Sequence, residues 1–181
     1  GGKGRQNAEE LLKLKDVQIT SIADPAKYWD LKDFYYKSIA GREPVKEMIE
    51  SHYRAGSGSY RINEYLDFRE MLANESSLDA ILCSTPDNTH AYVSIQAMRA
   101  GKHVYCEKPL THNIWEARKV REVALETGLA TQMGNVLHSG DGIRQTVEYL
   151  RDGAIGKVTE AHTWVPATRW NPGLKGLPTG P

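Results

Sequence analysis

The amino-acid sequence predicts an α/β protein in which a first domain with a parallel sheet is followed by the beginning of a second α/β domain. Short β-branched or apolar segments alternate with helical segments of about 10–15 residues, which is the pattern of βαβ units. The chain opens on a glycine-rich run that leads directly into the first helical segment. After Gly134 the alternation stops, so we place a domain boundary at Asn135 and assign residues 1–135 and 136–181 to the two domains.

The first two elements follow the glycine-rich start. Apolar side chains recur at helical spacing over Arg5–Lys15, which predicts an amphipathic helix. The β-branched run Val17–Ala23 predicts a short strand, and Asp24 and Pro25 end it. A helix followed by a strand at the start of the chain is consistent with a βαβ unit.

A long polar and aromatic stretch, residues 29–60, then interrupts the alternation. We interpret it as an insertion between core elements. It contains two predicted short helices, Leu31–Ile39 and Pro44–Tyr53, and a glycine- and serine-rich loop at 56–59. Pro44 suits the first turn of the second helix, where a missing backbone N–H costs nothing.

Regular alternation resumes after the insertion. Gly101 and Gly128 follow two of the helical patterns, as glycines that end helices do, and Asn113 with Glu116 resembles a capping box. We expect helices and strands, in turn, over Tyr65–Ala73, Leu78–Ser84, Asp87–Ala100, His103–Cys106, Asn113–Thr127 and Leu129–Met133.

The second domain begins with a predicted helix over Asp141–Asp152, whose apolar residues Ile143, Val147 and Leu150 we expect to face inward. Strict alternation of polar and apolar residues then predicts a half-exposed strand over Lys157–Val165. The glycine- and proline-rich end of the chain, 171–181, predicts a loop.

Composition restricts the function. The chain has 181 residues, and its 23 basic and 23 acidic residues balance, so we expect neither a nucleic-acid partner nor a membrane partner. Two cysteines, Cys83 and Cys106, lie in unrelated contexts, which predicts neither a disulfide framework nor a metal site. The chain starts without methionine and ends at Gly180-Pro181, so we expect it to be a fragment of a longer protein.

The glycine-rich start is the first candidate site. Gly1-Gly2-Lys3-Gly4 leads into a helix, and Asp24 ends the next strand 20 residues after Gly4. That interval is close to the ~20 residues between a dinucleotide-binding glycine turn and its ribose-binding acid. The glycines would let backbone N–H groups approach a pyrophosphate at the helix N-terminus. The alternative is a flexible start followed by an ordinary Asp-Pro turn.

Two further motifs lie just after predicted strands, at the sheet edge where open α/β proteins bind ligands. Ser84-Thr85-Pro86 precedes a helix that carries His90, and Glu107-Lys108 precedes Pro109. Simpler interpretations exist for both motifs. The first is also compatible with an ordinary strand-turn-helix connection in which the histidine is packed, and the second with a solvated ion pair.

In combination, the sequences TPDNTH and AGKHVYCEKPLT resemble the Gfo/Idh/MocA family of nicotinamide-dependent oxidoreductases, in a branch common in planctomycete-type bacteria. The resemblance implies a Rossmann domain followed by an α/β substrate domain. The first fingerprint glycine and the first strand of that pattern are absent from the chain. The resemblance therefore implies an incomplete Rossmann domain with a gap in its sheet.

The resemblance also implies roles for individual residues. The cofactor-binding set comprises Gly1, Gly4, Asp24, Ser84, Thr85, Pro86, His90, Glu107, Lys108 and Asn135, and the catalytic set comprises Lys108 and His138. Asn135 as a simple turn residue and His138 as a helix-start residue are the alternatives. Lys108 as an anchor of the loop or cofactor is the alternative to a catalytic lysine.

The function implied by the resemblance is hydride transfer between NAD, rather than NADP, and a sugar or polyol. Two alternatives stay open: a glycosidase that keeps NAD bound and oxidises its substrate transiently, and a nucleotide-binding protein without catalysis. We expect a sugar-like small-molecule substrate and a homo-oligomer for the complete protein. We expect a cytoplasmic location, or a periplasmic one if an export signal precedes residue 1.

Overall fold

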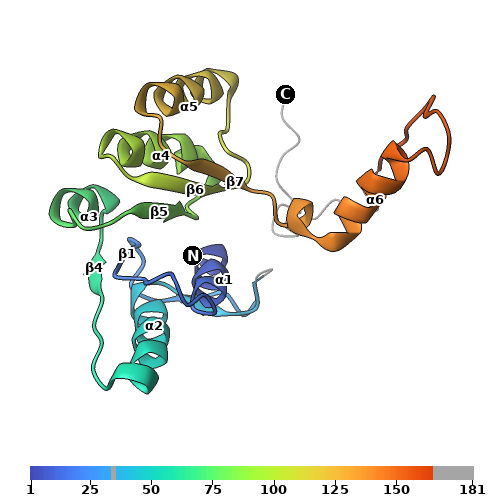
Figure 1. The fold of residues 1–181 in the computed structure, drawn as a ribbon. Coiled ribbons are helices and arrows are strands. Elements are labelled where there is room, and N and C mark those ends of the chain that lie inside the picture. The colour runs from blue at the N-terminus through green and yellow to red at the C-terminus, as the bar shows by residue number, and fades with distance from the viewer. Residues whose placement is uncertain (34–35, 165–181) are drawn as a thin grey trace, which may run out of the picture. The chain divides into compact units, whose positions relative to one another are not determined.

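The computed structural model describes residues 1–33 and 36–164, and the chain divides into two compact units, Gly1–Asn135 and Val136–Pro181. Figure 1 shows the elements of both units. The described part of the chain contains no helix that is both long and apolar enough to cross a membrane.

The first unit alternates helices and strands along most of its length. Its elements are α1 (Gly2–Leu11), β1 (Ser21–Ala23), β2 (Trp29–Asp30), β3 (Ile39–Ala40), α2 (Arg42–Ser57), β4 (Asn63–Tyr65), α3 (Phe68–Asn74), β5 (Ala80–Cys83), the 3-10 turn η1 (Asp87–Thr89), α4 (His90–Arg99), β6 (His103–Glu107), α5 (Ile114–Thr127) and β7 (Thr131–Gly134). The second unit contains the 3-10 turn η2 (Val136–Ser139) and α6 (Asp141–Arg151).

Parallel strands form two separate sheets in the first unit. β1 pairs with β4, and β5, β6 and β7 form a three-stranded sheet in that order. Among the described residues, neither β1 nor β5 has a hydrogen-bonded strand on its second side. The sheet is therefore divided at the position where the resemblance implies a missing strand.

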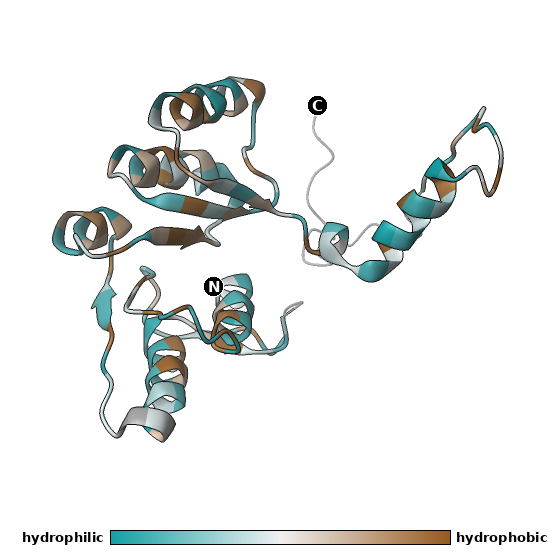
Figure 2. Cartoon of the chain, viewed as in Figure 1, coloured by the Kyte–Doolittle hydropathy of each residue, from teal (hydrophilic) through white to brown (hydrophobic). Residues whose placement is uncertain are grey.

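Two apolar cores accompany the two sheets. The larger lies between the three-stranded sheet and helices α3, α4 and α5, with Met98 and Val123 almost fully buried at its centre. α4 and α5 lie on the same side of that sheet (Figure 1), and β5 is strongly hydrophobic (Figure 2). The smaller core lies where α1 and α2 pack side by side, around Ala8, Leu12, Ile49 and Ile62.

Most predicted elements are confirmed, with shifted ends. α1 begins three residues earlier than predicted and ends at Leu11, while α2 extends the predicted Pro44–Tyr53 at both ends. Asn113 caps α5 by accepting the backbone N–H of Glu116 at 2.9 Å. Local sequence signals predict the alternation of strands and helices from β5 to β7, and the structure confirms this alternation.

The predicted helix over Leu31–Ile39 is wrong. β2 and β3 pair as an antiparallel hairpin, with Trp29 opposite Ala40, and the Leu31 N–H donates to the Ser38 carbonyl at 2.8 Å. The Asp30 carboxylate accepts the Lys32 N–H at 3.0 Å, a local bond that competes with helix formation.

The predicted helix over Tyr65–Ala73 begins too early. Asn63–Tyr65 forms β4 beside β1, and the helix starts only at Phe68. The Asp67 carboxylate fixes this start because it accepts the Arg69 N–H at 2.8 Å. A polar three-residue strand carries no apolar alternation, so only its pairing with β1 reveals it.

Two expectations for the second unit are wrong. Residues 157–164 form no strand, and no described residue pairs with them; Val165 lies outside the described residues. Ile143, Val147 and Leu150 of α6 are exposed, at 42%, 38% and 42%, instead of facing inward. A strand needs a hydrogen-bonded neighbour and an apolar helix face needs a packing partner, and the described part of this unit supplies neither.

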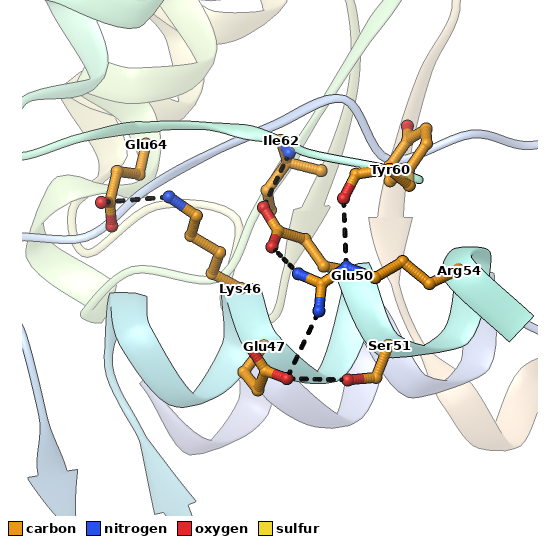
Figure 3. Close-up of polar contacts among 8 residues, drawn as sticks. All are labelled: Lys46, Glu47, Glu50, Ser51, Arg54, Tyr60, Ile62 and Glu64. Atoms are coloured by element: carbon orange, nitrogen blue, oxygen red, sulfur yellow. Dashed lines mark hydrogen bonds and ion pairs between the residues drawn. The ribbon is translucent and has the colours of Figure 1, made fainter. Parts of the chain in front are cut away.

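The connection from α2 to β4 is held by a buried carboxylate. Glu50, only 4% exposed, accepts hydrogen bonds from the Arg54 guanidinium and from the Ile62 backbone N–H, the latter at 3.0 Å (Figure 3). Burial alone would raise the pKa of Glu50, but these two hydrogen bonds outweigh it and lower the pKa. The network positions Ile62, and with it the strand that follows.

Candidate functional site

The N-terminus of α1 is open to an anion. Gly1 precedes the helix without a side-chain cap, and the first turn carries no acidic residue. The first backbone N–H groups of a helix have no partner within it, and the helix dipole favours negative charge there. A Cβ on Gly4 would lie 3.5 Å from the Cβ of Ser84, so this turn lies beside the end of β5.

Asp24 lies beside this helix start. One of its carboxylate oxygens is 2.8 Å from the Gly1 amino group, and the other accepts the Ala26 backbone N–H at 2.9 Å. The structure thus brings together the glycine turn and the acid that the sequence predicts as ribose ligand. The role of Asp24 toward a ribose stays a prediction.

Arg42 is a neighbour of Asp24 that the sequence analysis missed. Its guanidinium donates to the backbone carbonyls of Asp24, at 2.7 Å, and Pro25, at 3.1 Å, and lies 3.9 Å from Glu64. These contacts fix the turn after β1. Nothing in the sequence signals them, because Arg42 lies 18 residues beyond Asp24 and before the predicted start of its helix.

The residues that end β5 and β6 are both hydrogen-bonded to helix α1. The Asn7 amide donates to the Ser84 hydroxyl at 3.0 Å and to the Glu107 carboxylate at 2.8 Å. Asn7 is the second residue that the sequence analysis missed, since an asparagine inside a helix has no local signal of a distant partner. It ties the first helix of the chain to both strand-end motifs.

His90 joins the two strand-end loops from behind. It is 1% exposed, and its ring nitrogens lie 2.8 Å from the Thr85 carbonyl oxygen and 2.6 Å from the Pro109 carbonyl oxygen. The histidine therefore supports the turn at Thr85 and Pro86 rather than facing solvent. This position agrees with a packed histidine and with a supporting role behind a ligand, both of which the sequence left open.

The side chains of Glu107 and Lys108 have different surroundings. Glu107 is 4% exposed and lies 3.5 Å from the Lys3 ammonium, in addition to its bond from Asn7. Lys108 is exposed and makes no hydrogen bond or ion pair with any residue that the structure describes. The interpretation of these two residues as an ion pair with each other is therefore wrong. Glu107 faces α1, and the Lys108 ammonium is free to meet a ligand.

Glycine at position 134 belongs to the same arrangement. A Cβ there would lie 2.9 Å from a Glu107 carboxylate oxygen and 3.0 Å from the Tyr105 hydroxyl, so a larger residue would displace the ends of these side chains. Asn135 follows directly, and its N–H donates to the Met133 carbonyl at 3.0 Å, as in a turn. His138 belongs to the second unit, on η2, and its proposed role stays a prediction.

The carboxyl ends of β1, β5 and β6 thus gather around the start of α1. This is the edge at which open α/β sheets bind ligands. The donors and acceptors there comprise free backbone N–H groups, the Asp24 carboxylate and the Ser84 hydroxyl, and Lys108 follows the end of β6. Such a set suits a phosphorylated ligand with sugar hydroxyls.

Comparisons with known proteins agree with this geometry. The family model for Gfo/Idh/MocA, described as an oxidoreductase family with an NAD-binding Rossmann fold, matches residues 4–135. A 1,5-anhydro-D-fructose reductase of Ensifer adhaerens is 32% identical over 95 residues, which cover 52% of this chain and 28% of the relative.

Two further similarities extend over more of the chain. An alpha-N-acetylgalactosaminidase of Shewanella oneidensis is 25% identical over 171 residues, which cover 94% of this chain and 34% of the relative. The crystal structure of scyllo-inositol dehydrogenase from Lactobacillus casei, with bound NAD(H) and scyllo-inositol, matches with a TM-score of 0.68 and 20% identity over 88% of this chain and 41% of that chain. The latter similarity shows the fold alone. The chain thus spans about a third or less of the length of these two curated relatives.

Proposed function

Because this chain belongs to the Gfo/Idh/MocA family of NAD(P)-dependent oxidoreductases, with a Rossmann-type fold, we propose that it provides the dinucleotide-binding unit of an enzyme that transfers hydride between NAD and a sugar or polyol. One observation carries the proposal. The uncapped start of α1, the Asp24 carboxylate and the Ser84–Asn7–Glu107 hydrogen bonds lie together at the carboxyl ends of parallel strands.

The residues present fit a dinucleotide. Glycine at positions 1 and 4 leaves the first-turn N–H groups accessible to a pyrophosphate, which needs backbone donors at close range. Asp24 offers a carboxylate oxygen to ribose hydroxyls. Ser84, Thr85 and Pro86 would lie along the cofactor, His90 would hold their turn in place, and Asn135 would lie near the nicotinamide.

Asp24 supports NAD over NADP. A carboxylate accepts hydrogen bonds from a 2′-hydroxyl and repels a 2′-phosphate. Arg42 is the nearby cation that could reverse this preference, but its guanidinium is engaged by two backbone carbonyls and faces Glu64. A phosphate would have to compete with these partners, so the arginine is poorly available for NADP.

Lys108 is the proposed catalytic residue. Bound NAD would supply the hydride acceptor, and the protein must stabilise the charge that develops on the carbinol oxygen as its proton leaves. An ammonium group beside that oxygen lowers the energy of this charge and can carry the proton away. Lys108 is exposed and without a partner among the described residues, whereas Glu107 is already satisfied by Lys3 and Asn7. His138 is proposed as a second group on the substrate side.

A glycosidase that oxidises its substrate transiently is the second candidate. The similarity to the alpha-N-acetylgalactosaminidase favours it, because that alignment spans 94% of this chain whereas the alignment to the reductase spans 52%. In both candidates the dinucleotide site and Lys108 have the same role. The difference lies in whether the oxidised cofactor is regenerated within one turnover.

Two measurements test these proposals. Titration of the full-length protein with NADH and NADPH, followed by nicotinamide fluorescence, should show saturable binding with a preference for NADH. Turnover of sugars and polyols should then change the nicotinamide absorbance for a dehydrogenase, whereas release of an aglycone without net absorbance change would indicate the glycosidase. Binding without any turnover would support a nucleotide-binding protein without catalysis. Absence of saturable binding would contradict all three.

A further inference from the structure

Two buried cysteines face each other beneath the proposed dinucleotide site. Cys83 ends β5, Cys106 is its register partner on β6, and the two residues are only 2% and 1% exposed. Their sulfur atoms and a ring nitrogen of His90 lie within 4.8 Å of one another. Two cysteines and a histidine at this separation are compatible with either a metal site or a reactive thiol pair.

The hydrogen bonds of His90 argue against a metal. A histidine ligand needs a ring nitrogen whose lone pair points at the ion. Both ring nitrogens of His90 instead lie within hydrogen-bond distance of carbonyl oxygens, those of Thr85 and Pro109. Metal binding would have to break one of these bonds, which leaves two sulfurs as the available donors.

The surroundings of Cys83 lower the pKa of its thiol. The Thr85 hydroxyl lies 3.4 Å from the Cys83 sulfur. The neighbouring Cys106 thiol lowers the pKa of Cys83, and Thr85 and His90 act in the same direction against the effect of burial.

Cys106 has the opposite character. The neighbouring Cys83 thiol, together with burial, raises the pKa of the Cys106 thiol, whose S–H donates to the Glu107 carbonyl at 3.5 Å. The two thiols therefore differ in acidity, with Cys83 the more easily ionised of the pair. This is the division of roles between an attacking and a resolving cysteine.

We propose that Cys83 and Cys106 form a reversible dithiol–disulfide switch, oxidised by hydrogen peroxide, that controls dinucleotide binding at the ends of β5 and β6. The Cys83 thiolate attacks one peroxide oxygen, the O–O bond breaks, and the released hydroxide takes a proton to become water. Cys106 then attacks the sulfenic sulfur of Cys83, the S–O bond breaks, and a second water leaves with the Cys106 proton. Two thiols lose two electrons and one peroxide gains them, and an external dithiol reverses the reaction.

A small oxidant has space beside Cys106. A cavity of about 80 Å³ is lined by Cys106 and Ser94, with Met98 and Met133 among its other walls. A water molecule occupies about 30 Å³ in the liquid, so a peroxide molecule fits. The lining includes Cys106 and not Cys83, whose sulfur lies within 4.8 Å of the Cys106 sulfur, so peroxide would reach the pair from the Cys106 side.

The disulfide would move the site, and this consequence rests on the proposed function. Adjacent strands lie about 4.8 Å apart, within the range of about 4.4–6.8 Å that the Cα atoms of a disulfide span, whereas its Cβ atoms lie about 3.5–4.5 Å apart. Closing the bond therefore turns the two side chains toward each other and fixes the ends of β5 and β6 in one geometry. Ser84 and Glu107 directly follow the two cysteines, so their shared hydrogen bonds to Asn7 change with it.

Counting thiols tests the switch independently of cofactor binding. The full-length protein is treated with hydrogen peroxide, unfolded, alkylated and mapped by mass spectrometry. We expect both cysteines to lose alkylation together, to appear as one intramolecular disulfide peptide and to recover with dithiothreitol. Retention of both thiols, a disulfide between two chains, or sulfinic acid on a single cysteine would each overturn the proposal. Oxidation of Met98 and Met133 alone would overturn it as well.

Nucleotide titration then tests the control of binding. The oxidised protein should bind NADH at least about 10-fold more weakly than the reduced protein, the scale of one lost hydrogen bond. Cys106→Ser and Cys83→Ser should bind NADH like the reduced protein and should not respond to peroxide. A disulfide that forms without changing NADH affinity would overturn the control. If the reduced protein does not bind NADH at all, the proposed function fails while the thiol count still decides whether the switch exists.

Discussion

The Asn7 amide on α1 donates a hydrogen bond of 2.8 Å to the buried Glu107 carboxylate on β6, 100 residues away in the sequence. The same amide donates to Ser84 at the end of β5. One side chain therefore connects the smaller core, to which α1 belongs, with the ends of two strands of the larger sheet.

Replacing Asn7 by alanine should destabilise the protein by roughly 1.5–3 kcal/mol, because a buried carboxylate loses a hydrogen bond. Asn7→Asp should cost more, since it places two carboxylates in contact. Denaturant unfolding measures both changes. Lys13→Ala on the same helix is the control, because its pair with Glu10 is exposed at 65% and 71%. Equal stability of Asn7→Ala and the control would contradict the connection.

Asp24→Ala should narrow the preference for NADH over NADPH. Loss of a hydrogen bond to a charged group should weaken NADH binding about 10-fold or more, while removal of the negative charge should leave NADPH binding unchanged or improve it. Fluorescence titrations of both nucleotides measure the ratio, with the exposed Asp33→Ala as control. A wild-type protein that binds NADPH as tightly as NADH would refute the assignment.

In the full-length protein, Lys108→Ala should lower kcat by roughly 10²-fold or more, the scale of positioned acid–base and electrostatic groups, and should change NADH affinity little. Lys108→Arg keeps the positive charge but is a poorer proton carrier, so it separates the two contributions. Lys119→Ala, on the surface of α5, serves as the control. If Lys108→Ala keeps its kcat and loses nucleotide binding instead, the lysine is an anchor.

The predictable part of the fold has local signals. From β5 to β7, apolar strands alternate with helices whose capping residues and terminal glycines are visible in the sequence, as at Asn113 and Gly128. The hairpin of β2 and β3 and the polar strand β4 have none, because their only support is a partner strand elsewhere in the chain.

The residues of the candidate site also separate into those with a local sequence signal and those without one. Asp24, Ser84 and Glu107 could be named because they follow strands in recognisable motifs. Asn7 could not be named, because its partners lie 77 and 100 residues away in the sequence. Arg42 could not be named either, because it binds backbone carbonyls, which no sequence motif marks. The buried environment of Glu107 was equally hidden, because its partner Lys3 comes from the first turn of α1 rather than from the adjacent lysine.

Glu50→Gln should lower stability at neutral pH by about 1–3 kcal/mol, the value of hydrogen bonds to a charged group. The folded-state pKa of Glu50 is below its unfolded value, so its contribution is present above the unfolded pKa of about 4.3. The contribution disappears as the pH falls through the folded pKa, and wild type and variant should converge there.

Urea unfolding of Glu50→Gln at a series of pH values measures this convergence. Glu47→Gln is a matched control one turn earlier on α2, because Glu47 is 69% exposed and lies 3.7 Å from the same arginine. We expect the control to stay near wild type throughout. A constant difference between Glu50→Gln and wild type down to strongly acidic pH would contradict the role of the charge.

The isolated chain of 181 residues should be poorly stable. β1 and β5 each lack a strand on one side among the described residues, and short two-stranded sheets are marginal in water. Circular dichroism during heating should show a broad transition at low temperature. A cooperative transition at about 45–65 °C, as in ordinary mesophilic domains, would contradict this expectation.

The division of the sheet also bears on how the first unit opens. Its two cores meet through polar contacts of α1 with Ser84 and Glu107 and through Ala23 and Tyr65, which pack against the larger core, rather than through a continuous sheet. Opening along this line would break these contacts and would separate the two halves of the dinucleotide site while each core stays folded. A ligand that touches both halves binds only the closed form. Nucleotide binding should therefore act as a clamp, suppressing this opening in proportion to occupancy.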